Sequence, residues 1–204
     1  MNKAVKVRYY IESLCVYDFK QDEIINALYD LLNSLEDETV LTKQSRFFNL
    51  LSSHHSLRHY VSKLILTDDN VFTKAAAAGK CDELDPSILD GVKADLEKLE
   101  VIASISAEDI YKAEEDSDIA DVLKTMPKWN PNGRAMLPLT DDWAEHIEDL
   151  KSFHRTNGYG MFAKFVAFTW RNEEFVPITA IDSIRLTDLK NYEVQRGKVV
   201  DNTV

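Results

Sequence analysis

The side chains with the clearest chemical potential in this sequence are three neighbouring histidines, His54, His55 and His59. On a helix, His55 and His59 would lie four residues apart on one face, as two metal ligands do. A zinc site needs a third ligand, and no glutamate stands between them as in the zinc-hydrolase motif. We interpret them as surface or helix-end histidines, predict no metal site, and keep a metal-dependent hydrolase as the weakest hypothesis.

Two groups of carboxylates offer other chemistry. The run Asp68-Asp69-Asn70 has three oxygen ligands but lacks the glycine and the distal glutamate of a calcium loop, so we interpret it as a turn that caps a helix. The second group stands at the start of a predicted helix and is formed by Asp141, Asp142 and Glu145. Carboxylates there are typical partners of the helix dipole. No serine, cysteine or lysine lies in a nucleophile motif, so we predict no catalytic residue.

The C-terminal stretch from Gly158 to Val204 has a different character from the rest of the chain. Aromatic and β-branched residues alternate along Met161–Trp170, which predicts a strand after Gly158 and Gly160 have turned the chain. A polar turn follows, and residues 175–178 can return as a second strand with Pro177 at an edge. Thr187 is a suitable cap for a final helix or tail over 187–204.

This stretch resembles the segment that precedes the motor domain in an uncharacterised bacterial family of predicted AAA+ P-loop ATPases. The matching residues are Gly158, Gly160, Phe162, Ala163, Phe168, Trp170, Val176, Pro177, Leu186, Asp188, Leu189, Tyr192, Glu193, Gln195, Arg196, Asn202 and Thr203. Residues 60–100 match more loosely, through Asp68-Asp69-Asn70 and Phe72. In that family a comparable segment leads into a strand and a Walker A loop.

The phosphate-binding loop itself is absent from the sequence, because none of its six glycines begins a G-x-x-x-x-G-K-[ST] motif. The resemblance therefore implies a region N-terminal to the ATPase domain, with no cofactor of its own. ATP and Mg²⁺ are implied only for the downstream ATPase domain of the same polypeptide. In AAA+ proteins the chain before the Walker strand often lines the adenine pocket, so the resemblance implies adenine contacts from Leu189, Asn191 or Tyr192 once that domain is present. The alternative for Tyr192 is a core or hinge tyrosine.

Length and composition indicate an ordinary globular chain of 204 residues, with 45% hydrophobic residues, able to bury a sizeable core. Cys15 and Cys81 are too far apart for a short zinc or disulfide motif, so buried thiols are expected. The N-terminus lacks the apolar run of a signal peptide, and no apolar run reaches membrane-spanning length. We therefore expect a cytoplasmic protein with no membrane partner.

The net charge of −11 is concentrated in the middle of the chain. Residues 82–149 contain 19 acidic and 6 basic side chains, and the most acidic run, Glu114–Asp118, is predicted to be a loop or disordered. Such a surface repels phosphate backbones, so no nucleic acid partner is expected. It is either a solvated helical face or a docking surface for a basic protein.

Most of the sequence predicts helices. Apolar residues recur every three or four positions in 22–35, 40–51 and 57–65, and caps indicate further helices from Asn70 to Gly79, after Asp85-Pro86, after Ser106, and from Thr140 to about His154. Residues 3–18 fit helix or strand, and we favour helix. The predicted fold class is mainly α, a helical bundle with a small C-terminal β-hairpin-like element, α+β at most.

We divide the chain into a helical domain 1–125, an irregular linker 126–139 containing three prolines, and a helix plus β-hairpin module 140–204. The first functional hypothesis is a non-catalytic accessory region of a predicted AAA+ ATPase that recognises partners. It requires a P-loop domain encoded beyond Val204. The alternative is a self-contained acidic helical adaptor that binds a basic protein, with an affinity that falls steeply with salt.

Overall fold

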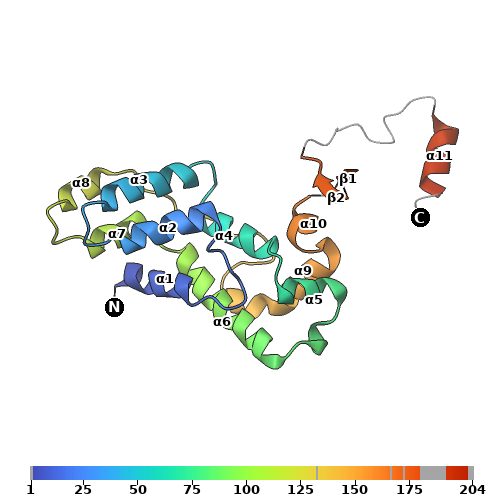
Figure 1. Cartoon of the computed structure of the whole chain (residues 1–204), viewed down its shortest axis with the longest axis horizontal. Helices are drawn as coiled ribbons and strands as arrows, with labels where there is room; N and C mark the ends of the chain where they lie inside the picture. Colours follow the sequence, from blue (N-terminus) through green and yellow to red (C-terminus); the bar gives the residue numbers. More distant parts are fainter. Residues whose placement is uncertain (1, 132, 166, 172, 180–191, 202–204) are drawn as a thin grey trace. The chain divides into compact units, whose positions relative to one another are not determined.

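The computed structural model describes residues 2–131, 133–165, 167–171, 173–179 and 192–201. The described part is mainly α-helical, with one two-stranded antiparallel sheet (Figure 1), which confirms the predicted fold class. Its elements in order are α1 Lys3–Glu12, α2 Glu23–Asn33, α3 Val40–Leu51, α4 Leu57–Leu66, α5 Val71–Ala78, η1 Cys81–Glu83, α6 Pro86–Ala103, α7 Ala107–Ala113, α8 Ala120–Thr125, η2 Trp143–His146, α9 Ile147–Asn157, α10 Gly160–Lys164, β1 Phe168–Arg171, β2 Glu174–Pro177 and α11 Glu193–Asp201.

Contacts divide the chain into two compact units, residues 1–164 and 165–204. In the first unit α2 packs against α3, α1 lies against α2 and α6, and α5 packs along α9 (Figure 1). Its core is continuous, and its largest fully buried side chains include Trp143, Tyr17, Phe47 and Phe72. None of the described helices is both long and apolar enough to cross a membrane.

The amphipathic pattern of α2 shows why the first helices form. Asp22 caps the helix by accepting the backbone N–H groups of Ile24 and Ile25 at 3.1 and 3.0 Å. The apolar stripe then faces the core, and its buried members are Ile24, Ile25, Ala27, Leu28, Leu31 and Leu32. The predicted helices over 22–35, 40–51 and 57–65 are therefore confirmed. The helix favoured over 3–18 forms only over 3–12, and residues 13–18 belong to a loop.

The caps predicted at Asn70, Gly79, Asp85 and Ser106 are also confirmed. Asn70 and Ser106 each form a capping box, with Thr73 and Asp109 respectively. Asp85 caps α6, which has proline in its first turn. Gly79 ends α5 with φ of 69°, a left-handed conformation that suits glycine.

The proposed linker 126–139 is part of the first unit, and the division lies between Lys164 and Phe165 instead. Trp129, Ala135 and Leu139 are buried in the core. The Trp129 indole N–H donates to the Ile105 carbonyl oxygen at 2.8 Å, and the Met136 N–H donates to the Ser62 hydroxyl at 2.8 Å. Prolines prevent a long helix here, but the apolar residues between them still fix the segment to the bundle.

The single helix predicted from Thr140 to His154 was wrong in its first turns. Thr140 does not cap it; the chain passes through Asp142 with φ of 53°, forms the 3-10 helix η2, and continues as α9 from Ile147. The Thr140 carbonyl oxygen instead accepts the Trp143 indole N–H at 3.0 Å. Burial of Trp143, which is fully enclosed, sets the backbone path at this point.

The strand predicted over Met161–Trp170 was wrong for its first half, because Gly160–Lys164 forms α10. The Gly160 N–H donates to the Asp68 carbonyl oxygen at 3.1 Å, which holds this short helix against the α4–α5 loop. Met161 and Phe162 are partly exposed. The alternation of large and small residues here therefore does not indicate a strand with one buried face.

The second unit contains the predicted hairpin. β1 and β2 pair antiparallel, with Trp170 opposite Phe175 and Phe168 opposite Pro177. Pro177 ends β2, as expected for a residue that cannot donate to a ladder. α11 follows at Glu193–Asp201. The expected cap Thr187 lies outside the described residues.

Candidate functional site

The loop between α2 and α3 carries three consecutive exposed carboxylates, Glu36, Asp37 and Glu38. α2 ends at Ser34, whose hydroxyl donates to the Leu31 carbonyl oxygen at 2.8 Å. Glu36 then adopts a left-handed backbone conformation with φ of 70°. The Asp37 carboxylate accepts the Thr39 N–H at 3.0 Å, which fixes the start of α3.

A second acidic loop connects α7 to α8. Glu114 ends α7 and is only 3% exposed, whereas Glu115, Asp116 and Asp118 are exposed. The Ser117 hydroxyl and its backbone N–H both donate to the Glu114 carbonyl oxygen, at 2.7 and 2.9 Å. The run predicted to be a loop or disordered is therefore a hydrogen-bonded turn.

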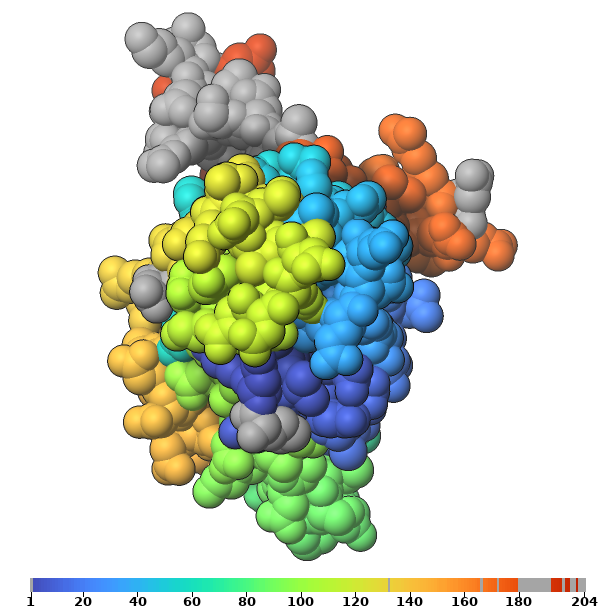
Figure 2. All heavy atoms as spheres, turned by 90° about the vertical axis from the view of Figure 1, so that its left-hand side faces the viewer, coloured from blue at the N-terminus to red at the C-terminus, as the bar shows by residue number. Residues whose placement is uncertain are grey.

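The two acidic loops meet, although Glu36 and Glu114 are separated by 78 residues in sequence. The Glu36 N–H donates to the Glu114 carboxylate. A hydrogen bond to a charged group contributes about 1.5–3 kcal/mol, which offsets the roughly 1–2 kcal/mol cost of a left-handed residue. Figure 2 shows the α7–α8 segment, in yellow-green, lying beside the blue α2–α3 segment on this face.

A cavity of about 420 Å³ opens between the loops, lined by Glu36, Lys112, Ala113, Glu114, Glu115, Asp116 and Ser117. Glu36, Glu115 and Asp116 line this cavity and are exposed. Together with their exposed neighbours on the same two loops they form what we call the acidic rim: Glu36, Asp37, Glu38, Glu115, Asp116 and Asp118. Among the described residues, the ion pairs include none of these six. One cation, Lys112, also lines the cavity, so the acidic rim presents a net negative charge beside a concave surface, which attracts cationic groups.

The histidine cluster lies elsewhere in the first unit. The His55 and His59 rings stack edge to face with centroids 5.1 Å apart, and His54 packs on Tyr60 at 4.5 Å. The pKa of His54 is lowered mainly by burial, so this ring favours the neutral form. No group of three potential metal ligands occurs within the described part of the chain.

The remaining carboxylates mostly have local structural partners. Asn70 caps α5, its amide donates to Asp68 at 2.6 Å, and Asp69 pairs with Lys74 at 2.6 Å. Burial raises the pKa of Asp68. The acids of 141–145 do not sit at the start of an α-helix. Asp141 instead pairs with Arg58 at 3.1 Å, and Glu145 lies 3.9 Å from Lys93.

Of the three residues with implied adenine contacts, Tyr192 alone is described, and it is 55% exposed just before α11. Leu189 and Asn191 lie outside the described residues. Buried thiols were expected at both cysteines, and this is wrong for Cys15, which is exposed, while Cys81 is buried.

Two polar clusters were missed by the sequence analysis. The fully buried Asp95 carboxylate accepts the N–H groups of Cys15, Val16 and Tyr17 at 2.9, 2.7 and 3.1 Å. Arg58 stacks 5.0 Å from the Trp143 ring centroid and donates to Glu100 at 2.8 Å. Neither cluster has a local sequence signal, because every partner is remote along the chain. Both hold loops in place.

Comparisons with protein-family models, with curated proteins and with solved structures give no match to this chain.

Proposed function

We propose that this chain is a cytoplasmic, non-catalytic partner-recognition module whose acidic rim binds a basic segment of another protein. The observation that carries this proposal is the convergence of the 36–38 and 114–118 loops around one cavity. Either acidic loop by itself could be a binding surface or simply a solvated helix end. Their juxtaposition supplies a concave surface with six exposed carboxylates, complementary to lysine and arginine side chains.

The test is binding of a labelled oligolysine peptide, followed by fluorescence anisotropy at low and high salt. The rim variant carries Glu115→Gln, Asp116→Asn and Asp118→Asn. The matched control carries Asp82→Asn, Glu83→Gln and Asp90→Asn, three exposed acids of η1 and α6. Both variants change the net charge by the same amount, so their comparison separates a local site from general attraction.

We expect the rim variant to bind about tenfold more weakly, because each exposed charge contributes about 0.5 kcal/mol. The control should stay near the wild-type affinity, and binding should weaken steeply with salt. Equal losses in the two variants would refute a local site. Binding to double-stranded DNA with comparable affinity would also count against it, since the rim should repel phosphates.

We also propose, on the resemblance of residues 158–204, that this module is the N-terminal accessory region of a predicted AAA+ ATPase. The second unit is separate in its contacts, and it exposes Trp170 by 60%, Tyr192 by 55% and Val194 by 71%. Large apolar groups of this kind suit packing against a further domain. On this proposal Leu189, Asn191 or Tyr192 contacts the adenine of ATP held by the downstream domain.

The decisive measurement for the second proposal is the gene sequence beyond the codon for Val204. A strand and a G-x-x-x-x-G-K-[ST] loop within a few tens of codons is the expected result. In the longer protein Tyr192→Ala should weaken ATP binding, whereas Tyr9→Ala, an exposed tyrosine of α1, should not. A stop codon in place of that loop would overturn the AAA+ assignment and leave the acidic-rim proposal intact.

A further inference from the structure

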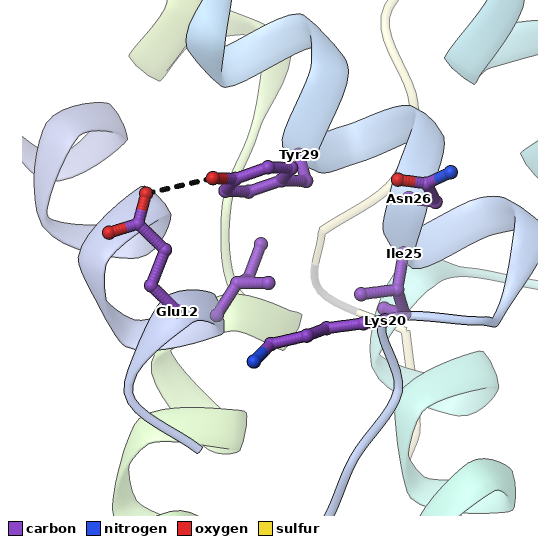
Figure 3. A pocket seen from close by; sticks show the side chains of 6 residues that line it. Glu12, Lys20, Ile25, Asn26 and Tyr29 are labelled. Atoms are coloured by element: carbon purple, nitrogen blue, oxygen red, sulfur yellow. Dashed lines mark hydrogen bonds between the residues drawn. The ribbon is translucent and has the colours of Figure 1, made fainter.

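A second cavity, distinct from the acidic rim, lies between the end of α1 and the start of α2. It has a volume of about 250 Å³ and is lined by Ile11, Glu12, Lys20, Ile25, Asn26 and Tyr29 (Figure 3). This size suits a molecule smaller than most cofactors, because typical ligand pockets span about 300–1,000 Å³. Its residues take no part in the functions proposed above.

The apolar floor of this cavity is rigid. Ile11 and Ile25 are each 2% exposed and belong to the core. Asp95 holds the backbone of residues 15–17 that leads from α1 toward Lys20, and Asp22 caps the helix that carries Ile25 and Asn26. The backbone segments that bound the cavity are therefore held by the Asp95 and Asp22 hydrogen bonds. Ligand binding need not order these segments.

Opposite charges flank the floor without neutralising each other. The Tyr29 hydroxyl donates to the Glu12 carboxylate at 2.9 Å, which orients that carboxylate (Figure 3). Figure 3 shows the Lys20 side chain running along the edge of the pocket from beside Ile25 toward α1, so that its ammonium group lies on the same side of this view as Glu12. Glu12, Lys20 and Asn26 are all exposed to solvent, and within the described part of the chain no ion pair includes Glu12 or Lys20.

We propose that this cavity binds a free α-amino acid with an apolar side chain. The Glu12 carboxylate accepts the ligand ammonium group, and the Lys20 ammonium pairs with the ligand carboxylate. The Asn26 side-chain amide supplies a further donor or acceptor, and the apolar side chain of the ligand occupies the cavity beside Tyr29, Ile11 and Ile25. One small zwitterion thus pairs with both charged side chains, which an anion, a cation or a hydrocarbon alone does not.

The test is titration of the ¹⁵N-labelled full chain with L-valine, L-leucine and L-methionine, monitored by backbone amide shifts. Two compounds act as chemical controls: leucinamide lacks the carboxylate, and 4-methylpentanoate lacks the ammonium. We expect saturable shifts around residues 11–12, 20, 25–26 and 29, with a dissociation constant on the order of 1 mM for the best zwitterion. Both control compounds should bind roughly two- to fivefold more weakly, because each leaves one solvent-exposed protein charge without a partner.

Single substitutions test the roles of the Glu12 and Lys20 charges in ligand binding. Lys20→Met and Glu12→Gln should each reduce affinity roughly two- to fivefold, as for an exposed charge pair, and Tyr29→Phe should reduce it less, because that change only removes the group that orients Glu12. Lys43→Met on α3, a residue that does not line the cavity, is the matched control and should bind as the wild type does. Circular dichroism checks that each variant is folded. The inference is overturned if no zwitterion shifts the cavity resonances, or if the two control compounds bind as tightly as leucine.

Discussion

The Asp95 carboxylate accepts the Val16 backbone N–H at 2.7 Å and thereby joins the middle of α6 to the loop that follows α1. The same oxygen also receives the N–H groups of Cys15 and Tyr17, and Lys98 lies 3.3 Å from the other oxygen. A single buried side chain thus takes the place of backbone partners for three consecutive residues. This is the interaction on which the path of the 13–22 loop most depends.

Asp95→Ala should lower the free energy of unfolding by about 3 kcal/mol, because it leaves three backbone N–H groups without an acceptor and removes the carboxylate beside Lys98. Urea denaturation measures the change. Asp90→Ala is the matched control, since Asp90 lies on the exposed side of the same helix. Its effect should stay within about 0.5 kcal/mol. Equal effects of the two substitutions would contradict the structural role of Asp95.

Arg58→Lys should destabilise the protein by about 2 kcal/mol despite preserving the charge. The guanidinium donates to Glu100, to the Thr140 carbonyl oxygen and to Asp141, and it stacks on Trp143. All three hydrogen bonds come from Nη2, and a lysine ammonium lacks the planar guanidinium face that stacks on the Trp143 ring. Arg46→Lys tests the same change at an exposed pair with Asp30. That variant should lose less than about 0.5 kcal/mol, and a similar loss at both positions would be inconsistent with the Arg58 network.

Gly79→Ala should cost about 1–2 kcal/mol, because alanine is strained at φ of 69°. The added methyl group itself meets no close contact, since its nearest neighbour, on Arg155, lies 3.7 Å away. Gly79→Asn separates strain from packing, because asparagine tolerates the left-handed region better than alanine does. Thermal unfolding should rank wild type above the asparagine variant and the alanine variant last. An alanine variant as stable as the wild type would show that the helix end can relax.

His154 should make the protein less stable as the pH falls. Burial between α5 and α9 lowers its pKa below the ordinary value of 6.5, because the charged ring is poorly solvated there. The unfolded chain takes up the proton near 6.5 while the native chain resists it, so stability drops between 6.5 and the lower native value. His154→Gln should flatten the pH dependence of urea unfolding in that window. An unchanged slope would contradict it.

His146 should affect the pH dependence of stability in the opposite direction to His154. Its hydrogen bond to Asp149 at 2.8 Å is the main cause of a raised pKa, supported by the Asp141 carbonyl oxygen at 3.1 Å. The stabilisation is therefore complete below 6.5 and disappears as the pH rises through the raised native value. His146→Gln should lower stability at acidic pH and leave it unchanged at alkaline pH. A deficit that grows with pH would refute this assignment.

The local features of the fold could be predicted because they depend on neighbouring residues. Asn70, Asp85 and Ser106 cap helices through contacts two or three residues away. The spacing of apolar residues such as Leu28 and Leu31 directly indicates the buried face of α2. Trp129 could not be assigned in this way. The prolines around it suggest a linker, whereas its burial depends on Ile105, 24 residues away.

In the candidate site, too, the features set by neighbouring residues could be predicted and those set by residues remote in sequence could not. The acidic runs 36–38 and 114–118 are each visible in the sequence, but their meeting depends on a hydrogen bond between Glu36 and Glu114. The strand expected at Met161 failed for a related reason. An alternating pattern predicts a strand only where one of its faces is buried, and here Met161 and Phe162 are partly exposed.

The hydrogen bond from the Gly160 N–H to the Asp68 carbonyl oxygen has a mechanical consequence. It fastens the last helix of residues 1–164 to the α4–α5 loop, at the point where the chain leaves that unit. A pulling force applied through residues beyond Lys164 enters the helical unit here and is carried next by α9 and by its long contact with α5. Rupture of this attachment would precede unravelling of α6, so under tension the bundle would yield from its C-terminal end.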